Sequence, residues 1–338
     1  MKLFIKEFQI DRIRIYSTYD HCKFNLCLKI SLKEGISLRN ISSPLDYTVW
    51  NASSVILRPS YLPKVIRLVV FLSGTGASPD KYSRLLKSAQ FAGNYVIGLP
   101  YLSQPFPVSQ SNAWCTSSFI SNPSDCNSEL HELVLFGNTP PDFEGASQDI
   151  WDVDPKYSVV KLLNNTLHNV DWGKLFLKYN AETDSHGIDW EKVIISGHSQ
   201  GAGHAAYLSY KKNIPAVLFS GPQDCVECSQ EWLRIMSNQN ILRRAMFHMN
   251  EECGPNPLDA KSECELNLML INLGIMGMKS SKFHWNNNSS IPETLETVIS
   301  MRTPTCEQGR TYHNSIALDK CASENIERIW IVLFSNFA

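Results

Sequence analysis

The side chain best placed to do chemistry is Ser199, at the centre of the pentapeptide Gly197-His198-Ser199-Gln200-Gly201. The apolar run 193–195 precedes the pentapeptide and the small-residue segment 202–206 follows it, which predicts a strand, a tight turn and a helix with the serine at the apex. A serine on such a turn has strained backbone angles, and glycines two residues to either side prevent a steric collision. The pattern favours a serine that acts as a nucleophile.

A serine hydroxyl needs a general base, and three histidines follow the predicted helix. We expect His313 to be this base, because it follows the last predicted core strand, where a loop can bring it back over the sheet. His248 lies within an apolar strand and is expected to be a packed residue, while His284 lies in a polar loop and is expected at the surface. His198 and His204 are too close to the serine in sequence to reach round to it.

The base in turn needs an acid that fixes its tautomer. Glu251 and Glu252 follow the predicted strand 244–249, and Asp224 follows the strand before it. We expect Glu251 to orient His313, with Asp224 as the second choice and Glu252 as the third. The remaining acids would then cap helices or lie in solvent.

Acyl transfer also requires hydrogen-bond donors for a developing oxyanion. The backbone N–H of Gln200 is one expected donor. The loop Gly74-Thr75-Gly76 follows another predicted strand, and its glycines allow the main chain to approach a substrate, so Thr75 and Gly76 are expected to supply a second donor. The alternative is an ordinary turn between a strand and a helix.

These segments together resemble the α/β-hydrolase superfamily, in a branch with a G-H-S-Q-G-A-G-H elbow followed by a G-P-x-D turn. The motifs that carry the resemblance are Leu72-Ser73-Gly74-Thr75-Gly76, the octapeptide Gly197 to His204, Phe219-Ser220-Gly221-Pro222-Gln223-Asp224 and His313-Asn314-Ser315. The resemblance covers about residues 64 to 334. It implies a triad of serine, acid and histidine and the hydrolysis of an ester or related acyl bond, which we expect to be a carboxylic ester. The chain departs from the usual pattern in having a Glu-Glu pair where an aspartate is more common.

The order of predicted elements agrees with that resemblance. Strands are predicted at 65–72, 95–98, 192–196, 216–220, 244–249 and 297–302, and helices at 80–91, 157–177, from the elbow to 212, at 231–236 and at 266–273. Alternating strands and helices predict an α/β-hydrolase fold, with a mainly parallel central sheet and helices on both faces. We expect short strands of uncertain fold in residues 1–60 and a catalytic domain in residues 61–338, interrupted by a long loop insertion at about 102–152.

Composition limits the partners. The 338 residues carry a formal net charge of −2, which gives no general attraction to nucleic acid. No apolar run approaches the roughly 20 residues of a membrane span. Neither a metal-ligand constellation nor a cofactor motif stands out, so we expect no cofactor, no metal, and a small or lipid-like ester as substrate. The oligomeric state is left open.

The cysteines favour an oxidising compartment. Ten are present, and eight form close pairs at 22 and 27, 115 and 126, 253 and 264, and 306 and 321, which favours local disulfides. Cys225-x-x-Cys228 is a further disulfide or two free thiols, with redox or metal chemistry as the alternative. N-glycosylation triplets begin at Asn40, Asn51, Asn164, Asn287 and Asn288. We expect a secreted protein whose signal peptide is missing from this sequence, with a cytoplasmic location as the alternative.

Two other functions remain as alternatives. A secreted binding protein could keep this fold after losing a working triad. Residues 201–206 also match the G-x-G-x-x-A of dinucleotide-binding folds, with Asp224 near the required acidic position. In that segment, however, the strand-to-helix turn is already formed by Gly197, and close helix packing explains Gly203 more simply.

Overall fold

The computed structural model describes residues 8–10, 13–16, 28–32, 54–103, 126–137, 155–224, 230–251, 265–278, 282–286, 290–292, 295–306 and 311–337. Within them, eleven strands form one sheet in the order β1-β2-β3-β4-β6-β5-β9-β10-β11-β13-β12. The strands are β1 (Phe8–Ile10), β2 (Ile13–Tyr16), β3 (Leu28–Leu32), β4 (Ser54–Leu57), β5 (Leu68–Leu72), β6 (Tyr95–Leu99), β9 (Val193–His198), β10 (Ala216–Phe219), β11 (Arg243–His248), β12 (Lys282–Trp285) and β13 (Thr297–Ser300).

The sheet has a parallel part and an antiparallel part. From β6 to β12 every neighbouring pair is parallel. The strands β1 to β4 are antiparallel to one another, and β4 joins the parallel part by pairing antiparallel with β6. The carboxyl ends of the parallel strands therefore meet along one edge, where ligand sites form in such sheets.

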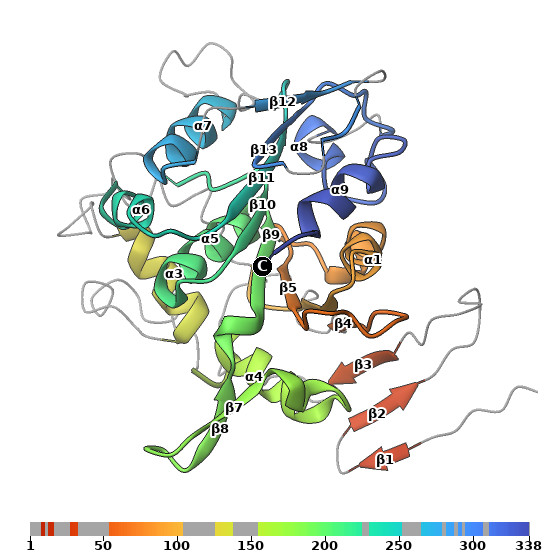
Figure 1. Ribbon diagram of the computed structural model, residues 1–338, viewed down its shortest axis with the longest axis vertical. Coiled ribbons are helices and arrows are strands. Elements are labelled where there is room, and N and C mark those ends of the chain that lie inside the picture. The colour runs from red at the N-terminus through yellow and green to blue at the C-terminus, as the bar shows by residue number, and fades with distance from the viewer. Residues whose placement is uncertain are drawn as a thin grey trace, which may run out of the picture.

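Helices cover both faces of the parallel strands (Figure 1). The helices are α1 (Ser83–Phe91), α3 (Cys126–Phe136), α4 (Val159–Asn169), α5 (Gln200–Lys212), α6 (Gln230–Ser237), α7 (Glu265–Ile275), α8 (Thr311–Ser315) and α9 (Glu327–Phe334). In Figure 1, α1, α8 and α9 lie on one side of the strands, and α3, α5, α6 and α7 lie on the other.

The sequence of β5 explains why helices cover both faces of the sheet. All five of its residues are apolar and fully buried. Leu68, Val70 and Leu72 belong to the hydrophobic cluster that also contains residues of α4 to α7, while Val69 and Phe71 belong to the cluster beneath α1 and α9. Because successive side chains of a strand point to opposite faces, a continuous apolar run requires helices on both.

This is the α/β-hydrolase fold: a mainly parallel sheet, helices on both faces, and a strand, turn and helix at β9 and α5 with a serine at the turn. The predicted fold class is confirmed. The predicted boundary between residues 1–60 and the catalytic domain stays a prediction.

Two local expectations were wrong. The segment 102–152, expected to be a loop, contains helix α3, because Leu130, Leu133 and Leu135 supply a buried face that packs it onto the core. The helix expected at 157–177 ends at Asn169. It is followed by a short 3-10 helix, Gly173–Phe176, and by β7 (Leu177–Asn180), which pairs with β8 (Ser185–Ile188) outside the main sheet.

In the described part of the chain, none of the helices has both the length and the apolar character that a membrane crossing requires.

Candidate active site

Ser199 lies at a sharp turn between β9 and α5, with φ of 55° and ψ of −122°. A Cβ atom on Gly197 would lie 2.1 Å from the carbonyl oxygen of Gly201, and a Cβ atom on Gly201 would lie 2.1 Å from the carbonyl oxygen of Leu72. Both contacts are far inside van der Waals distance, so this turn requires glycine at both positions. The positive φ of the serine is a strained conformation that the surrounding structure holds.

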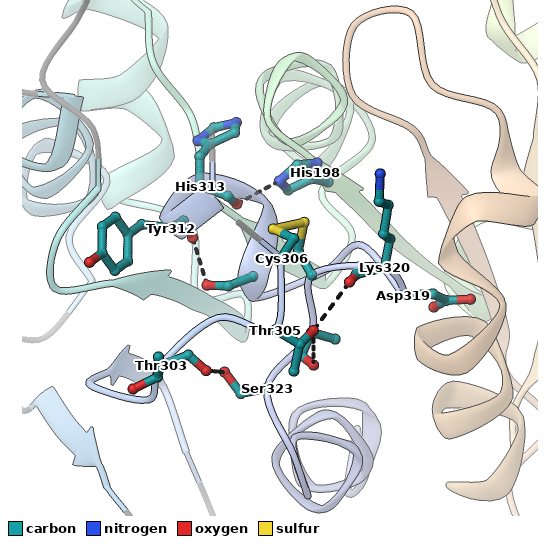
Figure 2. The surroundings of a disulfide bond; sticks show 12 residues. His198, Thr303, Thr305, Cys306, Tyr312, His313, Asp319, Lys320 and Ser323 are labelled. Carbon is teal, nitrogen blue, oxygen red and sulfur yellow. Dashed lines mark hydrogen bonds between the residues drawn. A yellow bond between two sulfur atoms is a disulfide. The ribbon is translucent and has the colours of Figure 1, made fainter. Parts of the chain in front are cut away.

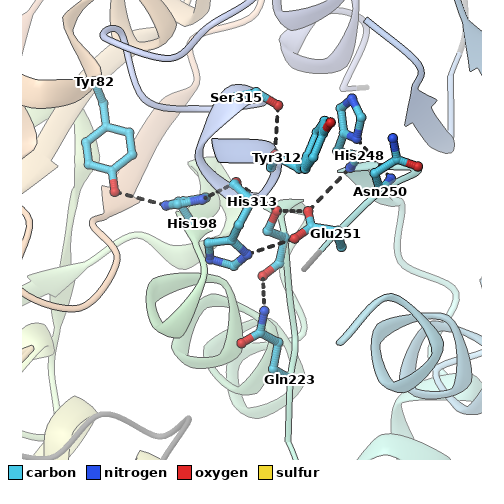
Figure 3. Close-up of polar contacts among 10 residues, drawn as sticks. Tyr82, His198, Gln223, His248, Asn250, Glu251, Tyr312, His313 and Ser315 are labelled. Atoms are coloured by element: carbon cyan, nitrogen blue, oxygen red, sulfur yellow. Dashed lines mark hydrogen bonds and ion pairs between the residues drawn. The ribbon is translucent and has the colours of Figure 1, made fainter. Parts of the chain in front are cut away.

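His313 lies in α8 and is held from two directions (Figure 3). Its Nδ1 is 2.9 Å from Oε2 of Glu251, and both side chains are buried. Its carbonyl oxygen lies 3.0 Å from Nε2 of His198, the residue immediately before Ser199. The fold thus brings a histidine 114 positions after the serine next to the serine's own strand.

Glu251 is an ionised carboxylate with several donors around it. Burial opposes the ionisation of Glu251. The charged form is favoured by the charge and hydrogen bond of His313, by the Ser220 hydroxyl and by the backbone N–H of His248. The net effect lowers the pKa of Glu251. A carboxylate accepts only, so the Nδ1 of His313 carries the hydrogen. In the neutral ring the Nε2 is then the basic nitrogen.

The other candidate acids and histidines lie elsewhere. The Oδ2 of Asp224 is 2.8 Å from Nε2 of a different histidine, His131 of α3. Glu252 lies outside the described residues. His248 is buried in β11, and its Nε2 is 2.8 Å from the carbonyl oxygen of Arg302. His284 is exposed, as expected, but it belongs to the edge strand β12 rather than to a loop.

The glycine loop after β5 lies directly against the elbow. A Cβ atom on Gly74 would be 3.3 Å from the Cβ of Ser199. The N–H of Gly74 donates to the Tyr82 hydroxyl at 3.0 Å, and the N–H of Gly76 donates to the Ser103 hydroxyl at 3.2 Å. Among the described residues, the N–H groups of Thr75 and Gln200 donate to no other protein group.

This bonding distinguishes the candidate oxyanion donors. The N–H of Gly76 is engaged by Ser103, whereas in the described ranges no protein acceptor faces the N–H of Thr75 or of Gln200. Gln200 is also the first residue of α5, a 13-residue helix, and a helix N-terminus favours negative charge. The geometry therefore favours Thr75 and Gln200 over Gly76 as the pair of donors.

Tyr82 and His198 connect this loop to His313. The Tyr82 hydroxyl lies 3.0 Å from Nδ1 of His198. Because the Nε2 of His198 must donate to the carbonyl of His313, its Nδ1 accepts, and Tyr82 is the donor. Burial raises the pKa of Tyr82 above its usual range, which keeps the phenol protonated. Gly74, Tyr82, His198 and His313 thus form one continuous set of hydrogen bonds.

A disulfide closes the chain around His313 (Figure 2). Cys306 bonds to Cys321, and the loop of 15 residues that they close contains α8. This confirms the expected pairing of these two cysteines. Seven of the other cysteines lie outside the described residues, and the side chain of the remaining one, Cys126, is likewise not described. The disulfide limits the conformations of the segment that carries His313.

The structure also bears on cofactors. No three His, Cys, Asp or Glu side chains gather as a possible metal site within the described ranges. Gly203 lies inside α5, where an added Cβ would be 3.2 Å from Oδ1 of Asp224 and 3.3 Å from Cε1 of His131. Close packing therefore explains this glycine, and Asp224 is buried in a hydrogen bond rather than placed to bind a ribose.

Sequence reasoning missed Tyr82 and His131. Tyr82 lies in a short 3-10 helix, Pro79–Tyr82, just after the glycine loop, and no residue spacing marks it. His131 belongs to a segment expected to be a loop. The apolar spacing of Leu130, Leu133 and Val134 was the available signal for a helix there.

Comparison with known proteins gives structural likenesses only. No protein-family model and no curated protein matches the sequence. A candidate dienelactone hydrolase from Klebsiella pneumoniae is 11% identical, with 83% of this chain and 89% of that chain covered and a TM-score of 0.38. An acylaminoacyl peptidase from Pyrococcus horikoshii is 12% identical, with 90% and 44% covered and a TM-score of 0.36. An S-formylglutathione hydrolase from Agrobacterium tumefaciens is 10% identical, with 80% and 85% covered and a TM-score of 0.34.

Proposed function

We propose that the protein is a serine hydrolase that cleaves a carboxylic ester through an acyl-enzyme. The observation that carries this proposal is the buried hydrogen bond of 2.9 Å between His313 and Glu251, beside the strand that ends immediately before Ser199. A buried acid and histidine next to a serine on a strained turn is the arrangement that activates a hydroxyl for nucleophilic attack.

In the proposed reaction, Ser199 Oγ attacks the ester carbonyl and His313 Nε2 accepts its proton. Glu251 holds the ring through Nδ1–H and stabilises the imidazolium that forms. The N–H groups of Gln200 and Thr75 donate to the oxyanion of the tetrahedral intermediate. His313 then protonates the departing alcohol, and a water molecule activated by His313 hydrolyses the acyl-enzyme.

The test is labelling of the purified full chain with a fluorophosphonate, together with hydrolysis of p-nitrophenyl esters of increasing acyl length. We expect Ser199→Ala to abolish labelling and His313→Ala to lower its rate by about 1,000-fold or more. Ser185→Ala, in the exposed β7–β8 hairpin, is the matched control and should label like the wild type. A folded wild type that does not label would contradict the proposal and favour a binding protein on the same fold.

We also propose that the protein works in the secretory pathway. The Cys306–Cys321 disulfide supports this, because such bonds persist in oxidising compartments. The test is expression of the full gene in eukaryotic cells and measurement of a glycosidase-sensitive mass shift in the medium. Asn164 is not an expected acceptor, because it lies half-buried in α4. Retention of an unmodified protein in the cytosol would contradict the proposal.

A further inference from the structure

A second series of hydrogen bonds joins buried polar side chains, separate from the contact of His313 with Glu251. It begins at Asp224, whose Oδ2 is 2.8 Å from Nε2 of His131, and continues from Nδ1 of His131 to Nδ1 of His204 at 2.9 Å. The Nε2 of His204 is 3.4 Å from Nε2 of Gln200, and Oε1 of Gln200 is 2.8 Å from Oγ1 of Thr75. Asp224, His131, His204 and Gln200 are all at most 4% exposed.

The acceptor at one end sets the direction of every bond. A carboxylate only accepts, so His131 donates to Asp224 from Nε2 and, as a neutral ring, accepts at Nδ1. His204 must then donate from Nδ1 and accept at Nε2, which is the nitrogen that the Gln200 amide faces. The Gln200 carbonyl oxygen is left to accept from Thr75. Every group thus donates toward Asp224, and each histidine has one defined tautomer.

The surroundings of His204 favour its neutral form. Burial, together with the neighbouring His131, lowers the pKa of His204 well below its usual range. The ring of His131 stacks on Tyr207 with centroids 5.0 Å apart, and Tyr101 packs edge-on against His204. Tyr101 itself donates to the carbonyl of Ser73, at the start of the glycine loop.

This series of hydrogen bonds ends at Gln200 and Thr75. Thr75 is exposed on the glycine loop, and Gln200 follows the serine. Their backbone N–H groups are the proposed oxyanion donors, and their side chains hydrogen-bond to each other. A polar chain buried among apolar side chains gives little net stability over apolar packing, but it fixes the relative positions of its members.

We propose that Asp224, His131 and His204 are positioning residues that act through Gln200 and Thr75 to hold the two oxyanion donors at a fixed separation. This inference rests on the proposed hydrolase function. It assigns Asp224 a role at the same reaction centre, as part of the support of the oxyanion hole rather than as the partner of His313. It also predicts that the effect of changing His204 reaches catalysis through the hydrogen bond between Gln200 and Thr75, so that it does not add to the effect of changing Thr75.

The first test measures the direction of the hydrogen bonds without any activity assay. Nitrogen-15 NMR of the labelled full chain, assigned with His131→Gln and His204→Gln, distinguishes the two tautomers of each ring and the doubly protonated form. We expect hydrogen on Nδ1 of His204 and on Nε2 of His131 at neutral pH. The opposite tautomer of either ring, or a doubly protonated His131, would overturn the proposed direction of the chain.

The second test is a double-mutant cycle on hydrolysis of a p-nitrophenyl ester. We expect Thr75→Val and His204→Phe each to lower kcat by about 10- to 100-fold with KM nearly unchanged, since both displace a donor that acts in the transition state. The double variant should be no slower than the slower single variant. Thr75→Ser keeps the hydroxyl and should recover most of the lost kcat. Thr183→Val, in the exposed β7–β8 hairpin, is the matched control and should equal the wild type.

The outcomes separate this inference from the proposed function. If the wild type neither labels nor hydrolyses esters, the hydrolase proposal fails and the positioning role fails with it. If the wild type labels but the two losses multiply, or neither variant loses activity, the positioning role alone is wrong. If His204→Phe no longer unfolds cooperatively on heating, Gln200→Met replaces it in the cycle. Gln200→Met interrupts the same series of hydrogen bonds with a side chain of similar size.

Discussion

The Nε2 of His198 lies 3.0 Å from the carbonyl oxygen of His313, so the residue beside the proposed nucleophile holds the backbone of the proposed base. The other nitrogen of His198 accepts from Tyr82, which in turn accepts from the N–H of Gly74. One imidazole therefore connects the elbow, the glycine loop and α8.

The first prediction concerns this ring. His198→Phe keeps the aromatic packing against His313, whose ring centroid is 4.9 Å away, but removes the closer of two donors to the buried His313 carbonyl, leaving the Ser220 hydroxyl at 3.2 Å. Such a loss is worth about 1 to 3 kcal/mol. We expect a kcat reduced by about 10- to 100-fold and a lower melting temperature by circular dichroism. Tyr82→Phe should lose less, because the bond to His313 remains. Unchanged kinetics in His198→Phe would show that α8 is positioned by other contacts.

The second prediction is a pH dependence of stability that comes from Glu251. The pKa of this carboxyl is lowered in the folded state from an ordinary value of 4.5. The contribution of Glu251 to the free energy of unfolding is therefore fully present above the ordinary pKa of 4.5, and it is lost as the pH falls through the lower pKa of the folded state. We expect the wild type to lose more unfolding free energy than Glu251→Gln between about pH 5 and about pH 2 in urea titrations. Equal losses in both proteins would contradict the lowered pKa.

The third prediction concerns the Cys306–Cys321 disulfide. The loop that it closes is 15 residues long and contains His313, so the bond restrains both the unfolded chain and the proposed base. In the chain-entropy treatment, removing a disulfide that closes a loop of this size lowers the free energy of unfolding by about 3 kcal/mol. We expect Cys306→Ser/Cys321→Ser to melt at a lower temperature and to have a lower kcat. A double variant with wild-type kcat below its melting temperature would show that packing alone holds α8.

The fourth prediction separates stability from activity. Arg244 of β11 donates to the carbonyl oxygens of Val332, Leu333 and Ser335 at the end of α9, at 3.0, 2.8 and 2.6 Å. Burial lowers the pKa of Arg244 to about 10, so the guanidinium stays charged at neutral pH. We expect Arg244→Met to destabilise the protein by about 2 to 4 kcal/mol. Arg244 binds the carboxyl end of α9, whereas α9 contacts the segment after α8 through Trp330, whose Nε1 donates to the carbonyl oxygen of Ile316 at 2.8 Å. We therefore expect kcat per folded molecule to change little, and a large fall in kcat would contradict this separation.

Much of the fold was determined by local sequence. The run of five apolar residues in β5 can be buried only if both faces of the sheet are covered, and this follows from the alternation of side chains along a strand. The elbow is equally local, because the collisions that exclude side chains at Gly197 and Gly201 arise within the turn and with the adjacent strand. The pairing of Cys306 with Cys321 likewise followed from their nearness in sequence.

Only the tertiary structure decided which acid meets which histidine. Asp224 and Glu251 both follow parallel strands, so both arrive at the same edge of the sheet and spacing along the chain does not distinguish them. The packing of α3 on α5 brings His131 to Asp224, and α8 brings His313 to Glu251. Hydrogen bonds act over about 3 Å, whereas sequence patterns report periodicity along the chain. The contact between side chains 62 or 93 residues apart therefore depends on how the helices pack.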